Sequence, residues 1–246
     1  MNRPPTDTAA APRFTRRAVD PAGIMTIVSD KNQRMGDRPM SGVADAIMKR
    51  VNAHGRGRWV CTPKDFLDLG SREAVDQALS RLVRAGQLRR AGRGLYDLPR
   101  ISTVLQRPAP VDLDAAVAAM ARRDGIRIMP DGATAAHRLG LTNAVPARAG
   151  YVTDGATRSV GIDGGTIRFR HAGPRVMRWA GRPAAAAVQA LRWLGPDAAR
   201  DARVVAALRR RLPEAAKRDL ARNGRDLPGW ALPLARDIAG EVTAAP

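Results

Sequence analysis

The sequence contains a single cysteine, Cys61, among its 246 residues. One thiol cannot form an intrachain disulfide, and it cannot build a thiolate metal cluster. No run of about 18 apolar residues occurs, so the sequence predicts no membrane span. The N-terminus has no apolar segment followed by a cleavage site, and therefore lacks the pattern of a secretory signal. These absences favour a cytoplasmic protein with no membrane partner.

Patterns typical of catalysis and cofactor binding are equally scarce. No GxxxxGK[ST] or GxGxxG segment follows a predicted strand, so the Asp-Gly pairs are interpreted as turns. Cys61 lies in a short apolar strand, where an inert buried thiol is expected. The histidines fall on different predicted elements, without HxH or HExxH spacing; they are His54, His137 and His171. We therefore predict no catalytic residue, no metal and no cofactor.

A DNA-targeted nuclease, or another nucleic-acid enzyme, is the alternative function. Loop aspartates can supply the carboxylates of a two-metal site, but their spacing does not distinguish that role from ordinary turns. The aspartates concerned are Asp124, Asp131, Asp154 and Asp163.

Basic residues are abundant. Lys and Arg number 42 against 23 Asp and Glu, which gives a formal charge of +19. A chain this basic attracts polyanions, and nucleic acid is the first partner to expect. A high-GC bias toward arginine and alanine is the alternative explanation, so charge alone does not decide the function.

The stretch from Gly70 to Pro99, GSREAVDQALSRLVRAGQLRRAGRGLYDLP, carries the clearest pattern. Ser71 can cap a helix whose apolar residues recur at helical spacing, and Gly86 can end it. A glycine-bounded AGRG turn then joins two short strands with arginines at the tip. A helix followed by a basic two-stranded wing is typical of a winged helix-turn-helix.

The predicted fold class is α+β, with an N-terminal winged helix-turn-helix followed by a mixed α/β C-terminal domain with a helical tail. Residues 1–40 are predicted to form a disordered basic arm. An equal alternative is that the true start codon lies downstream and these residues have no function. The DNA-binding domain is expected at 41–100, a connector at 101–110, and the second domain at 111–240. That second domain can dimerise or present a surface to a partner, and the role of its basic tail stays open.

Within the first domain, helices are expected at 41–54 and 62–69 and a strand at 58–61. In the second domain, Asp163-Gly164-Gly165 predicts a hairpin turn. The other elements expected there are helices at 111–124 and 133–139, strands at 126–129, 149–153, 158–162, 166–171 and 176–179, and helices at about 183–194, 197–211, 213–223 and 229–240.

A recognition helix fits the major groove, where its polar side chains can reach base edges. Tyr96 is expected to pack the wing rather than to touch DNA. A solvated basic helix without a DNA role is the alternative. The predicted base contacts are Arg72, Gln77, Ser80 and Arg81. The predicted backbone and wing contacts are Ser71, Thr62, Lys64, Arg84, Arg89, Arg90 and Arg93.

The stretch from Gly70 onward, preceded by VADAIMKRV and CTPKDFLDLG, resembles the N-terminal part of the AbiEi-type antitoxins of bacterial type IV toxin–antitoxin systems. The resemblance continues through IMPDGATAAHRLGLTNAVP, GYVTDG and TIRFRHAG, and so covers about residues 41 to 180. It implies a nucleoid-associated autorepressor, not an enzyme. Two copies would bind an inverted repeat in double-stranded DNA at the operon's own promoter. It also implies that the second domain counters a cognate nucleotidyltransferase-like toxin.

Overall fold

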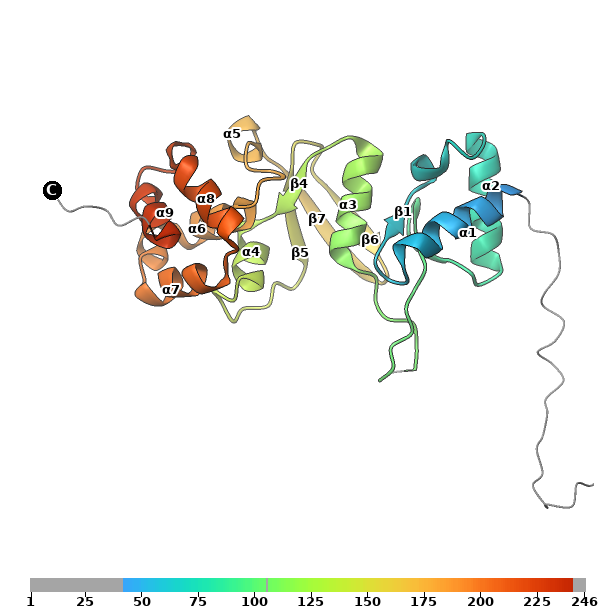
Figure 1. Ribbon diagram of the computed structural model, residues 1–246, viewed down its shortest axis with the longest axis horizontal. Helices are drawn as coiled ribbons and strands as arrows, with labels where there is room; N and C mark the ends of the chain where they lie inside the picture. Colours follow the sequence, from blue (N-terminus) through green and yellow to red (C-terminus); the bar gives the residue numbers. More distant parts are fainter. Residues whose placement is uncertain (1–41, 105, 241–246) are drawn as a thin grey trace, which may run out of the picture. The chain divides into compact units, whose positions relative to one another are not determined.

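The protein is described from a computed structural model, in which residues 42–104 and 106–240 are placed. The arm predicted at 1–40 lies outside the described residues. The described chain is a mixed α+β structure with two small sheets (Figure 1), in agreement with the predicted class. None of the helices in the described ranges is long and apolar enough to cross a membrane.

The first part of the described chain packs two helices against a three-stranded antiparallel sheet of order β1-β3-β2. Ile47 and Leu79 are fully buried at its centre, because the apolar residues of each helix recur on one face, and Phe66 of the turn between β1 and α2 is buried with them. Its elements are α1 (Gly42–His54), β1 (Val60–Cys61), the 3₁₀-helix η1 (Pro63–Phe66), α2 (Arg72–Arg84), β2 (Arg89–Gly92) and β3 (Leu95–Asp97).

The helix predicted at 62–69 is a single 3₁₀ turn, η1. The backbone N–H of Thr62 donates to Asp65 Oδ2 at 2.8 Å, and Pro63 occupies the first position of the turn. One turn is enough to bury Phe66, whereas Leu67 is 45% exposed. A longer helix would bury no further apolar face, so packing does not extend it.

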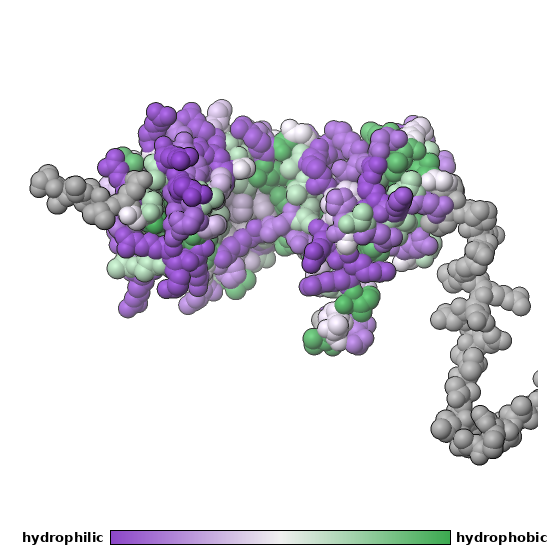
Figure 2. Space-filling model, viewed as in Figure 1, coloured by the Kyte–Doolittle hydropathy of each residue, from purple (hydrophilic) through white to green (hydrophobic). Residues whose placement is uncertain are grey.

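The connector between the two parts forms a loop that projects from the rest of the described chain (Figure 1). Ile101 and Pro108 form an isolated antiparallel bridge at its base. Ile101 is 54% exposed and Val104 86% exposed. The projecting loop is accordingly one of the hydrophobic spots on the largely hydrophilic face drawn in Figure 2.

The second sheet has the order β4-β5-β7-β6, in which β5 and β7 run parallel and the other neighbours are antiparallel. Asp163 and Gly164 have φ of 46° and 80°, and they form the tight turn that the sequence predicts between β6 and β7. The strands are β4 (Ile128–Pro130), β5 (Ala149–Thr153), β6 (Arg158–Ile162) and β7 (Gly165–His171).

Helices lie on both faces of this sheet. The helix α3 (Leu113–Asp124) buries Val117 and Met120 against Tyr151, Ile167 and Phe169, and it crosses in front of β7 and β6 in Figure 1. On the opposite face, α4 and α6 pack together with a core that includes Val152 and Met129. The remaining helices are α4 (Gly132–Arg138), α5 (Pro174–Met177), α6 (Ala185–Ala199), α7 (Ala202–Arg211), α8 (Glu214–Arg222), the 3₁₀-helix η2 (Gly224–Asp226) and α9 (Ala231–Ala239).

Two expectations for this half are wrong in detail. The segment 176–179 is not a strand: α5 occupies its start, and Val176 and Trp179 meet the helical core together because i and i+3 share one face of a turn. The helix predicted at 197–211 is divided. Gly195, with φ of 77°, kinks α6, and Asp201 caps a separate α7 through the N–H of Arg203.

The β2–β3 hairpin lies against the edge strand β6. The N–H of Asp163 donates to the carbonyl of Ala91 at 3.0 Å, and a Cβ on Gly92 would stand 3.0 Å from the carbonyl oxygen of Gly161. From α3, Arg122 donates to the carbonyl of Val60 at 3.0 Å. The hairpin, itself part of the first sheet, is therefore packed against the edge of the second sheet and does not stand alone in solvent.

Candidate nucleic-acid interface

The helix α2 begins at a well-formed cap. The Oγ of Ser71 accepts from the N–H of Ala74 at 3.2 Å, which satisfies one of the free donors of the first turn. Val75 and Leu82 are buried along one face, so the opposite face is turned to solvent. Packing thus fixes which side of α2 is available to a partner.

Hydrogen-bonding side chains fill the solvent face of α2. Arg72 and Asp76 form an exposed ion pair at 2.9 Å, and Arg84 donates to Ser80 at 3.4 Å. The side chain of Gln77 makes no hydrogen bond with any described residue. The exposed side chains of this face are Arg72, Glu73, Asp76, Gln77, Ser80, Arg81 and Arg84.

The hairpin places two more arginines beside α2. The register shifts between Arg90 and Gly92, and Gly94 supplies a positive φ of 66° at the turn. Arg90 lies opposite Tyr96 on the neighbouring strand, and Tyr96 is half-buried against the core below while it also lines the groove beside α2. Arg90 and Arg93 are exposed, and their guanidinium groups form no ion pair within the described residues.

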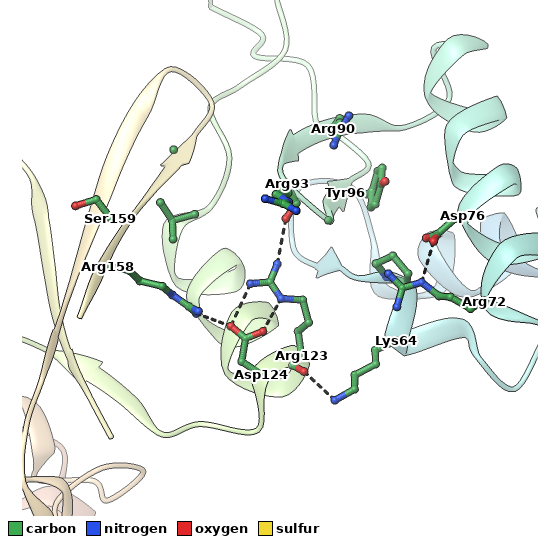
Figure 3. A pocket seen from close by; sticks show the side chains of 14 residues that line it. Lys64, Arg72, Asp76, Arg90, Arg93, Tyr96, Arg123, Asp124, Arg158 and Ser159 are labelled. Atoms are coloured by element: carbon green, nitrogen blue, oxygen red, sulfur yellow. Dashed lines mark hydrogen bonds and ion pairs between the residues drawn. The ribbon is translucent and has the colours of Figure 1, made fainter. Parts of the chain in front are cut away.

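A groove of about 840 Å³ is lined by residues of η1, the start of α2 and the hairpin, and by residues of α3 and β6 (Figure 3). Six cationic side chains line it against two carboxylates, Asp76 and Asp124. Such a groove attracts an extended anion, because unbalanced positive charge along low-dielectric walls concentrates the potential. The cations are Lys64, Arg72, Arg90, Arg93, Arg123 and Arg158.

Asp124 holds the two arginines of the second half in place. Its carboxylate accepts from Arg123 Nε at 2.7 Å and also from Arg158 (Figure 3). These bonds, with that of Arg123 first, lower the pKa of Asp124 to about 2. Arg123 also donates to the carbonyl of Arg93 at 3.0 Å and accepts from Lys64 Nζ at 2.8 Å through its own carbonyl. The tip of the hairpin and the start of η1 are therefore fastened to α3.

Two of the predicted contact residues are not presented to a partner. Thr62 is fully buried, and its hydroxyl donates to Asp65 at 3.1 Å, so it serves the turn at η1. Arg89 pairs with Asp97 at 2.7 Å and with Asp163 at 3.4 Å, which raises the pKa of Arg89. Asp97 is only 2% exposed, so Arg89 is the counter-ion of a buried carboxylate. Neither residue retains its expected role at the phosphate backbone.

The residues weighed for catalysis lie apart. Within the described ranges, no three or more His, Cys, Asp or Glu side chains stand close enough to hold a metal ion. Asp131 caps α4 through the N–H of Thr134, and Asp154 pairs with Arg127 at 2.8 Å. Cys61 is fully buried, and burial raises the pKa of its thiol to about 12. Each of these groups has a structural partner or a buried site of its own.

The sequence did not identify Arg123 and Arg158 as groove residues. Arg123 ends a helix and Arg158 begins a strand, so neither has a spacing that points to α2. Only the docking of the hairpin onto β6 brings them to the groove.

Comparison with known proteins gives no functional name. The model of a family of unknown function, DUF6088, matches residues 46–216. The crystal structure of the RV2827C protein from Mycobacterium tuberculosis is similar over 85% of each chain, with 18% identity and a TM-score of 0.39. No curated protein matches the chain.

Proposed function

We propose that this chain, which belongs to the DUF6088 family of unknown function, binds double-stranded DNA at a specific sequence and thereby regulates transcription. The basic groove between α2, the hairpin and β6 is the observation that carries the proposal. The order α1, β1, η1, α2, β2, β3 supports interpreting the first part as a winged helix-turn-helix, with α2 as the recognition helix.

The dimensions of α2 suit the major groove. The diameter of an α-helix with its side chains, about 10–12 Å, matches the width of about 12 Å of that groove, and the 13 residues of α2 extend for about 20 Å. Gln77 and Ser80 lie one turn apart and can donate to and accept from base edges. Arg72 reaches the same face from the first turn, where it can contact guanine.

The hairpin and the groove supply contacts to the phosphate backbone. Arg90 and Arg93 are exposed cations beside α2, and Lys64 and Arg84 extend the basic surface on either side. Contacts of this kind fix the position of a protein on duplex DNA without reading its sequence. The proposed division is therefore base reading by α2 and phosphate binding around it.

Autorepression and antitoxin activity extend the proposal on the resemblance to the AbiEi-type antitoxins alone. Two copies on an inverted repeat would block the operon's own promoter, and the second half would oppose a nucleotidyltransferase-like toxin. Co-expression with such a toxin, in cells that the toxin otherwise arrests, tests the second role. Rescue by the full chain supports it, and unchanged arrest at matched expression contradicts it.

Selection of a binding site from random duplex DNA, followed by gel-shift titration, tests the DNA proposal. We expect one enriched sequence, and we expect Arg72→Ala with Gln77→Ala to weaken binding to it by at least about tenfold. Arg192→Ala, at an exposed arginine of α6, is the control and should bind as the native chain does. Absence of any enriched sequence, or equal binding by both variants, would refute the proposal.

The nuclease alternative is tested on the same DNA. Purified protein with Mg²⁺ should leave supercoiled and linear duplex intact over hours if it only binds. Cleavage that persists through further purification and is lost in Asp124→Asn or Asp154→Asn would show that the protein is a nuclease and not only a repressor.

A further inference from the structure

A second basic cavity lies at the base of the hairpin. It has a volume of about 310 Å³ and four of its eight lining residues are arginines. The arginines come from the loop between α1 and β1, from β2 and from the chain just after β3. The lining residues are Arg56, Gly57, Arg58, Arg89, Arg100, Ala109, Pro110 and Asp112.

Local backbone geometry holds the cavity's arginines in position. Gly57 has a positive φ of 70°, and its N–H donates to the carbonyl of Leu98 at 2.7 Å. A Cβ on Gly57 would stand 3.2 Å from Cγ of Arg100, so the absence of a side chain lets the stem of Arg100 lie across it. The alternation Gly55-Arg56-Gly57-Arg58 thus places two arginines on a tight loop beside a third.

The charge of this cavity is poorly balanced. Arg89 is neutralised by Asp97 and Asp163. The carboxylate of Asp112 caps α3, where it accepts from the N–H groups of Asp114 and Ala115 at 2.9 and 3.1 Å. The other three arginines, Arg56, Arg58 and Arg100, form no ion pair with any described carboxylate. The guanidinium group of Arg56 donates only to the carbonyl of Pro99, at 3.4 Å.

We propose that this cavity binds a compact phosphate anion of one or two phosphate groups. Guanidinium groups match phosphate oxygens with paired donors, and three of them around one small space repel each other until an anion enters. The lining contains no aromatic side chain for a nucleobase to stack on, so the recognised chemistry is the phosphate itself. The volume admits a diphosphate and excludes a duplex.

The location of the cavity gives the anion a structural role. Arg58 precedes β1, Arg100 follows β3, and Ala109 and Asp112 lead into α3. A bound diphosphate would bridge the first part of the described chain to the second through these segments. Its binding does not depend on the DNA proposal, because the groove at α2 shares no lining residue with this cavity.

Calorimetric titration of the full chain with inorganic pyrophosphate, at ionic strength held constant with NaCl, tests the proposal. We expect saturable binding at one site, weakened at least about tenfold by Arg58→Gln with Arg100→Gln. Arg192→Gln with Arg225→Gln, at exposed arginines elsewhere, should retain it. Arg90→Gln with Arg93→Gln should also retain it while losing DNA affinity. Circular dichroism verifies that each variant folds.

Several outcomes would overturn the inference. If the heat of pyrophosphate binding never saturates, the anion is attracted only by the overall charge of the chain. The same conclusion follows if Arg192→Gln with Arg225→Gln weakens binding as much as Arg58→Gln with Arg100→Gln does. If only Arg90→Gln with Arg93→Gln weakened pyrophosphate binding, the anion would bind in the groove beside α2 and not in this cavity. If Arg58→Gln with Arg100→Gln weakened only DNA binding, the cavity would serve a backbone phosphate instead. Failure of DNA binding in every protein, with pyrophosphate still bound, would refute the proposed function and leave this site intact.

Discussion

Salt dependence separates phosphate contacts from base contacts at the proposed interface. The perturbation is Arg90→Gln with Arg93→Gln, which removes two exposed cations from the hairpin. Counting these two with Lys64 and Arg84 gives about four phosphate contacts for each protomer, and each contact contributes about 0.9 to the slope of log affinity against log salt. The native slope should then be about −3.6, and the variant slope about −1.8.

These slopes predict different losses over one accessible salt range. Between about 50 and 200 mM salt, native affinity should fall about 150-fold and variant affinity about 12-fold. Gln77→Ala should keep the native slope while losing about 1–3 kcal/mol of discrimination between the selected site and a scrambled one. Fluorescence anisotropy with labelled duplexes at several salt concentrations measures both quantities.

Slopes that do not divide in this way would contradict the assigned phosphate and base contacts. A hairpin variant with the native slope would show that Arg90 and Arg93 do not approach phosphate. If Gln77→Ala reduced the slope and left the discrimination between selected and scrambled sites unchanged, Gln77 would contact the DNA backbone and not the bases. Arg192→Ala provides the matched loss of one exposed arginine outside the groove and should leave slope and discrimination unaltered.

Three further predictions follow from the described contacts. Asp76→Asn removes a carboxylate from the groove and releases Arg72, so duplex affinity should rise about two- to fivefold in anisotropy titrations; a fall would contradict the placement of DNA there. Asp124→Asn should lower the free energy of unfolding, measured in urea at pH 7, by about 1–2 kcal/mol, because Arg123 and Arg158 lose their carboxylate partner. The pKa of Asp124 is lowered on folding to about 2, so its stabilisation exists above its unfolded pKa and disappears as pH falls from about 4 to 2; a pH-independent difference would reject this linkage. Cys61 should resist iodoacetamide at pH 8 in the native protein and react in urea, and rapid native labelling would contradict its burial.

The elements that the sequence predicts best are those whose pattern and turn chemistry agree. The strands at 149–153 and 158–162 have the predicted bounds, because Asp163-Gly164 fixes the turn that follows the second of them. The helix α2 has both a serine cap and an apolar face. In such segments local preference and burial select the same structure.

What the sequence could not predict depends on partners distant along the chain. Thr62 and Arg89 have the residue types of phosphate contacts, but Asp65 and Asp97 engage them inside the fold. Whether an arginine is an exposed cation or a counter-ion depends on the carboxylate that folding brings to it. Likewise, the parallel pairing of β5 with β7 joins strands that are not consecutive, and no local pattern specifies it.

The same long-range contacts fix the position of the hairpin, on which the proposed function depends. Its base is tied to the second half through Asp163, whose carboxylate pairs with Arg89 at 3.4 Å and accepts from the N–H of Val111 at 3.0 Å. Its tip is tied through the bond from Arg123 to the carbonyl of Arg93. A hairpin fixed at both ends loses little conformational entropy on binding, so its arginines contribute more of their interaction energy to affinity. The fixed spacing from α2 also means that only a duplex presenting phosphate at that distance gains the full set of contacts. In the proposed function, discrimination between DNA sites therefore includes the shape of the backbone as well as the bases that α2 reads.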